Sequence, residues 1–91
     1  MNDLRTNKTE LYIIIECVCE DGTDDIDTFI FDNKKAAREH FKNLVKNDKK
    51  FLAEESRNDT IEEHKNSYCS FPEGGYSTTH YWVGLLTTKN A

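Results

Sequence analysis

The fold is decided by residues 10–31, which read ELYIIIECVCEDGTDDIDTFIF. The odd positions from Leu11 to Cys19 are all apolar, whereas the even positions mix apolar with acidic side chains. This period of two, with three consecutive isoleucines, predicts a β-strand over 11–19 that buries one side. A cluster of turn residues at 21–25 then separates it from a second predicted strand over 26–31. Because the spacing is short, we expect the two strands to form an antiparallel hairpin.

A helix is predicted after this hairpin. Asp32 or Asn33 can cap its start, and apolar residues then recur on one helical face. These residues are Ala37, Phe41, Leu44 and Val45. The helical pattern is clear to Lys46 and is weakened by Asn47-Asp48. Because Leu52 falls on the same face, the predicted end of the helix lies between Lys46 and about Glu55. Residues 56–65 are polar and are predicted to be a loop or a frayed continuation of the helix.

The C-terminal third predicts two further strands, over 67–71 and 76–87, joined by a turn at 71–76. In the last strand, Tyr81 alternates with Trp82, so at least one of these two side chains should lie outside the main core. Gly84 interrupts the row that contains Trp82, which indicates a bulge or a close contact there.

The order is therefore strand, strand, helix, strand, strand. It predicts an α+β two-layer fold, with a four-stranded, mainly antiparallel sheet (ββαββ) and one helix packed on one face. We expect the apolar stripe of the helix to lie on Leu11, Ile13 and Ile15, and the other sheet face to be open to water. Large apolar groups on such a face often mark interaction sites. Residues 10–91 are expected to form one domain after a flexible segment over 1–9.

Composition excludes several classes of protein. The 91 residues are 36% hydrophobic and 32% charged, with a formal net charge of −5. The sequence has no apolar run near the ~20 residues of a membrane span, and its start lacks the apolar core of a secretory signal. Three cysteines are an odd number for a disulfide framework and fit a reducing compartment. We therefore expect a cytoplasmic protein without membrane contact.

Two patterns suggest chemistry, and each has a simpler interpretation. Cys17 and Cys19 point the same way from a strand, so with Cys69 and His80 they could form a zinc site. The simpler interpretation is that the two thiols are small core residues, and we expect no metal and no cofactor. The second pattern is a row of cations at helical spacing, which spans roughly 21 Å at the helical rise. These cations are Lys35, Arg38, Lys42, Lys46 and Lys49.

This basic stripe could follow a phosphate backbone, or it could be an ordinary solvated helix face. The acidic total argues against nucleic-acid binding, since like charges repel at long range. The sequence also has no glycine-rich phosphate loop, no nucleophile elbow and no convincing pair of acid and base residues, so we expect no enzyme activity.

Acidic and aromatic residues favour a protein-interaction module. Carboxylates between the first two strands could steer a partner electrostatically, and aromatic residues around the last hairpin are typical of binding hot spots. The predicted partner-binding residues are Asp21, Asp24, Asp25, Asp27, Tyr76, His80, Tyr81 and Trp82. In general appearance the chain is similar to small acidic proteins of phages and mobile elements. One version of the hypothesis is therefore an inhibitor that occupies the basic cleft of a nucleic-acid-handling protein. An exposed sheet face also permits a homodimer.

Overall fold

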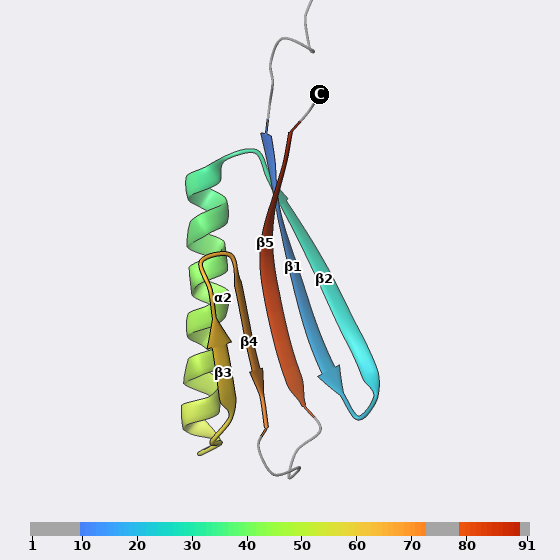
Figure 1. Ribbon diagram of the computed structural model, residues 1–91, viewed down its shortest axis with the longest axis vertical. Helices are drawn as coiled ribbons and strands as arrows, with labels where there is room; N and C mark the ends of the chain where they lie inside the picture. The colour runs from blue at the N-terminus through green and yellow to red at the C-terminus, as the bar shows by residue number, and fades with distance from the viewer. Residues whose placement is uncertain (1–9, 73–78, 90–91) are drawn as a thin grey trace, which may run out of the picture.

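The computed structural model describes residues 10–72 and 79–89, which form one sheet and one helix (Figure 1). In the sheet, whose strand order is β2-β1-β5-β4-β3, all neighbouring strands are antiparallel. The predicted α+β class, with one helix and an antiparallel sheet, is therefore confirmed. The elements are β1 (Glu10–Glu20), β2 (Thr23–Phe31), α2 (Lys34–Glu54), β3 (Thr60–Glu63), β4 (Ser67–Phe71) and β5 (His80–Lys89).

The prediction of four strands in the order ββαββ was wrong, because β3 adds a fifth strand at one edge of the sheet. It lies inside the segment 56–65 that was predicted to be a loop or frayed helix. Its sequence, Thr-Ile-Glu-Glu, has a single apolar residue, and an exposed edge strand needs no apolar alternation. The predicted flexible segment 1–9 and most of the predicted turn at 71–76 lie outside the described residues.

The β1–β2 hairpin is longer than predicted because its turn is tight. Only Asp21 and Gly22 separate the strands, and both have positive φ angles, of 53° and 82°. This is the backbone of a type I′ turn, for which Asp-Gly is a preferred sequence and whose twist matches that of the flanking strands. Thr23, Asp24 and Asp25 consequently pair with β1 instead of forming a loop.

Helix α2 begins and ends as its sequence indicates. The Asn33 side-chain oxygen accepts a hydrogen bond of 2.9 Å from the Ala36 amide, so Asn33 is the N-cap. The helix continues to Glu54, and Leu52 is buried on the same side as the earlier apolar residues. The predicted stripe is thus confirmed; its buried members are Ala37, Phe41, Val45 and Leu52.

The helix packs on the opposite face of β1 from the one predicted. Ile14 is fully buried in the core, whereas Leu11 is 37% exposed. The placement of the helix on Leu11, Ile13 and Ile15 was therefore wrong. Both rows of β1 are apolar, and the register decides between them: Ile14 pairs with Phe29 on one side and with Leu85 on the other.

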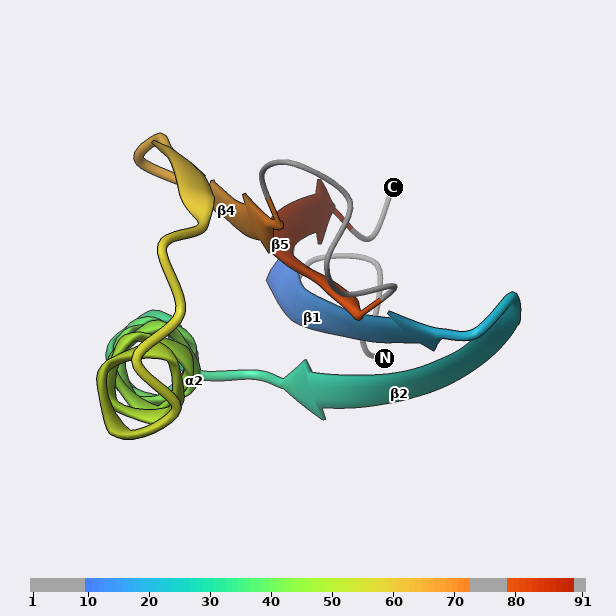
Figure 2. The ribbon, with the colours of Figure 1, turned by 90° about the horizontal axis from the view of Figure 1, so that it is seen from below.

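Two partly buried hydrogen bonds join α2 to β4. The hydroxyl groups of Tyr68 and Ser70 both donate to one carboxylate oxygen of Asp48, at 2.7 and 2.8 Å. These two hydrogen bonds give the Asp48 carboxylate its partners within the helix. Figure 2 shows α2 on one side of the twisted sheet, with the turn of the β1–β2 hairpin on the side far from the helix.

Candidate functional site

The sheet surface opposite α2 is apolar, and we call it the helix-free face. Its exposed large side chains retain between 37% and 64% of their accessible surface. They are Leu11, Ile26, Ile30, Trp82 and Leu86. Ile13 and Ile15 lie half-buried among them. A soluble monomer seldom exposes a contiguous apolar patch of this kind unless the patch is an interaction site.

Strand register makes this surface continuous across the sheet. One cross-strand row joins Ile30, Ile13 and Leu86. A second row joins Ile26, Cys17, Trp82 and Cys69. Because neighbouring residues on paired strands share a face, the rows form one patch over β2, β1 and β5 that reaches β4. The sequence predicted an open sheet face and named His80 and Trp82, which lie on it, but it assigned the odd row of β1 to the core and so missed Ile13 and its neighbours.

Trp82 lies against Gly84 on the helix-free face. A Cβ atom at Gly84 would be 2.5 Å from the Cη2 atom of the indole, so only glycine leaves room for the ring in this position. The prediction of a close contact at Gly84 is confirmed, and the pairing of β5 with β1 is continuous there. The ring therefore lies along the sheet and remains 39% exposed.

Tyr81 and Trp82 point to opposite faces, as their alternation predicts. The Tyr81 hydroxyl donates to Glu16 at 2.6 Å on the helix side, and burial raises the pKa of this tyrosine well above its ordinary value. Tyr81 is therefore not brought together with Trp82. His80 is exposed on the helix-free face beside Cys19, and Tyr76 lies outside the described residues.

All four residues of the hypothetical zinc site line one hollow of about 300 Å³, at the acidic end of the helix-free face. They are Cys17, Cys19, Cys69 and His80. However, Cys17 and Cys69 lie on strands either side of β5, about 10 Å apart at the usual strand spacing. Tetrahedral zinc holds sulfur at about 2.3 Å. Within residues 10–72 and 79–89, no three such side chains approach closely enough to hold a metal ion, so this arrangement does not fit zinc.

The thiols are also poorly suited to nucleophilic chemistry. Burial raises the pKa of Cys17 and Cys69, and hydrogen bonding to Asp24 raises the pKa of Cys19. Because the thiolate is the reactive and metal-binding form, a raised pKa leaves little of it at neutral pH. All three cysteines are half-buried on the helix-free face and lie outside the core, so the simpler prediction that Cys17 and Cys19 are core residues was wrong.

The distal end of the β1–β2 hairpin is strongly acidic and extends away from α2 (Figures 1 and 2). Residues 16–33 include no Lys or Arg. Glu16 lies directly opposite Asp27 in the β1–β2 pairing, an arrangement of like charges that is unfavourable in a sheet. We call this end of the hairpin the acidic hairpin; its carboxylates are Glu16, Glu20, Asp21, Asp24, Asp25 and Asp27.

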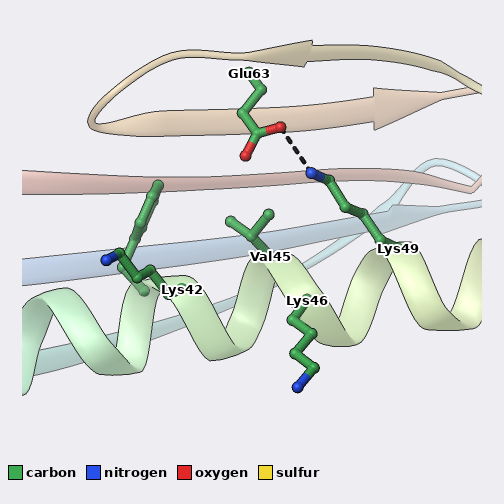
Figure 3. Close-up of a pocket in the computed structure, with 6 residues that line it drawn as sticks. Lys42, Val45, Lys46, Lys49 and Glu63 are labelled. Atoms are coloured by element: carbon green, nitrogen blue, oxygen red, sulfur yellow. Dashed lines mark hydrogen bonds and ion pairs between the residues drawn. The ribbon is translucent and has the colours of Figure 1, made fainter.

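The basic stripe lies on α2, and part of it holds β3 and β4 to the helix. Arg38 donates to the carbonyl oxygen of Lys65 and to the side chain of Asn66, both at 2.7 Å. Lys49 forms an ion pair with Glu63 at 2.7 Å across a hollow of about 320 Å³, whereas Lys46 points away from the strands (Figure 3). Nucleic-acid binding through this stripe stays a prediction, with Arg38 and Lys49 already engaged within the chain.

No protein-family model matches the sequence, and no curated protein or solved structure is significantly similar to it. In the part of the chain that the structure describes, no helix has the length and apolar character needed to cross a membrane. Function is therefore inferred from the geometry of the chain itself.

Proposed function

We propose that this chain is a non-catalytic protein-interaction module that docks a partner protein on its helix-free face. The observation that carries the proposal is the continuous apolar surface around Ile30, Ile13 and Leu86, which the helix does not cover. Burying apolar surface is the main favourable term in protein association, at roughly 25 cal/mol per Å² before the costs of binding.

Trp82 supports the proposal because of its type and its place. Tryptophan is enriched among residues that dominate binding energies, especially near the centre of an interface. Here the indole lies in a cross-strand row with Cys17 and Cys69, beside the 300 Å³ hollow. A flat aromatic ring next to a shallow hollow offers both a contact surface and a recess for a partner side chain.

The acidic hairpin gives the docking surface a charged end. Asp24 lies on the helix-free face opposite Cys19, whereas Glu16, Asp25 and Asp27 lie on the helix side of the same hairpin end. Together these carboxylates attract a cationic neighbouring surface and repel an acidic one, which affects association rates more than the final affinity. The charge therefore selects among partners and orientations, while the apolar centre supplies most of the affinity.

Affinity capture with matched variants tests the proposal. A tagged full-length chain is incubated with nuclease-treated bacterial lysate that also contains the untagged chain. Ile30→Arg places a charge on the helix-free face, and Ile61→Arg makes the same change at an isoleucine on the helix side of edge strand β3. We expect the wild type and Ile61→Arg to capture the same protein and Ile30→Arg to lose it. Equal capture by all three would contradict the proposal.

A further inference from the structure

We propose that the occupant of the helix-free face is a second copy of this chain, packed face to face across a two-fold axis. The inference rests on the proposed function, since it names the partner of that same surface. Three properties of the face support it: an uncharged centre, an acidic hairpin at one end, and an area of the size that a dimer needs.

The uncharged centre makes the face self-complementary. In a two-fold interface the same patch is used on both copies, so a charged side chain near the axis would meet its own copy. The row of Ile30, Ile13 and Leu86 and the row that contains Ile26 and Trp82 include no charged residue. An apolar centre carries no such penalty.

The acidic hairpin determines how the two copies are oriented. A two-fold axis parallel to the strands would bring the two acidic hairpins together, each with Asp24 on the helix-free face and Asp21 in the turn. An axis perpendicular to the strands places the hairpins at opposite ends of the dimer. Strands of 9 to 11 residues then separate the hairpins by roughly 30 Å, well beyond the ~8 Å Debye length of physiological salt. The charge distribution therefore selects the second arrangement.

The area of the helix-free face is of the order that a stable dimer needs. Strands β2, β1 and β5 cover roughly 450 Å² in projection, from their length and a spacing of about 4.8 Å. The accessible area is larger than this projection because side chains protrude from the sheet, and part of β4 adjoins it. The total therefore approaches the roughly 800 Å² per partner of a standard interface. Two such faces would pack as the sheets of a β-sandwich do, with the helices outside.

Sedimentation analysis of the full chain tests the inference. Between about 1 and about 100 µM, we expect the mass to rise from 10.6 kDa to twice that value. Ile30→Arg and, separately, Leu86→Arg should each weaken the dimer at least ten-fold, while Ile61→Arg should leave it unchanged. Circular dichroism establishes that each variant is folded. A dimer that persists in both face variants would overturn the assignment to this face.

Trp82 provides a second readout that needs no variant. It is the chain's one tryptophan and lies on the helix-free face, so its emission should shift to shorter wavelength as concentration rises. A constant single-chain mass together with an unchanged emission would overturn the inference. The proposed function would then still stand if lysate capture of a different protein depends on Ile30. If capture from lysate also does not depend on Ile30, both the dimer and the proposed function are contradicted.

Discussion

Gly84 determines the position of Trp82 at the scale of a single residue. In Gly84→Ala, the new methyl group would overlap the Cη2 and Cζ2 atoms of the indole, which must move. Because these atoms are at the far end of an exposed side chain, we expect a stability loss of only about 1 kcal/mol, with a clear change in tryptophan emission. Urea unfolding followed by fluorescence measures both. An emission spectrum identical to that of the wild type would contradict the placement of the ring; Thr88→Ala on the same strand is the control.

Tyr68 and Tyr81 couple stability to alkaline pH. Burial and hydrogen bonds to Asp48 and Glu16 raise the pKa of both tyrosines above their ordinary value of 10.0. The unfolded chain therefore releases these protons at a lower pH than the folded chain, and stability is lost as pH rises above 10.0.

We expect Tyr68→Phe to be less stable than the wild type at neutral pH, by about 1 kcal/mol, because Asp48 loses a donor. Its stability should also fall less steeply above pH 10.0, since one of the two coupled groups is gone. Urea unfolding at a series of pH values gives both quantities. A slope equal to that of the wild type would show that Tyr68 ionises as readily in the folded state.

Two ion pairs of different burial join the elements around the end of the helix. Arg57 binds Asp59 through two hydrogen bonds, of 2.6 and 3.0 Å, and also donates to the Thr79 carbonyl. The Asp59 side chain is only 2% exposed, so Arg57→Ala leaves a buried carboxylate without its cation. We expect a loss of about 2–4 kcal/mol. The exposed Lys49–Glu63 pair is the control: Lys49→Ala should cost less than about 1 kcal/mol. Equal losses in urea unfolding would contradict this distinction.

At the scale of helices and strands, local sequence patterns could predict some elements and not others. The apolar stripe of α2 and the strand Ser67–Phe71 depend on local patterns and are found as predicted, and Asn33 is the N-cap of the two candidates that the sequence left open. β3 has too few apolar residues to form a pattern. The helix-covered face of β1 was wrongly assigned because both rows are apolar, and the choice depends on pairing with the distant strand β5. Alternation predicted that at least one of Tyr81 and Trp82 lies outside the core, and the structure shows that it is Trp82, whereas the partial exposure of Ile13 and Ile15 was not predicted.

At the scale of the whole molecule, charge gives the dimer a salt dependence of known sign. Each copy carries −5, so the two copies repel each other at long range. We expect added salt to tighten self-association a few-fold between about 50 and about 300 mM, because the repulsion is screened. Sedimentation at several salt concentrations measures this. A foreign cationic partner would show the opposite sign, with weaker binding at higher salt.

Charge reversal in the acidic hairpin provides a variant that tests the same salt dependence. Asp24→Lys, Asp25→Lys and Asp27→Lys together change the formal net charge from −5 to +1. The dimer should be retained and its salt dependence should flatten, because the hairpins lie at opposite ends and most of the repulsion is gone. Loss of self-association in this variant would place the hairpin inside the interface.

Site-specific photocrosslinking tests the central claim, that the helix-free face is covered by protein, most directly. A photoreactive amino acid is placed at position 30, and in a second sample at position 61, as the matched site on the helix side. Adducts are then identified by mass spectrometry after irradiation in lysate. We predict abundant adducts from position 30 only, with this chain itself as the captured protein. Adducts from position 61 but none from position 30 would contradict the claim.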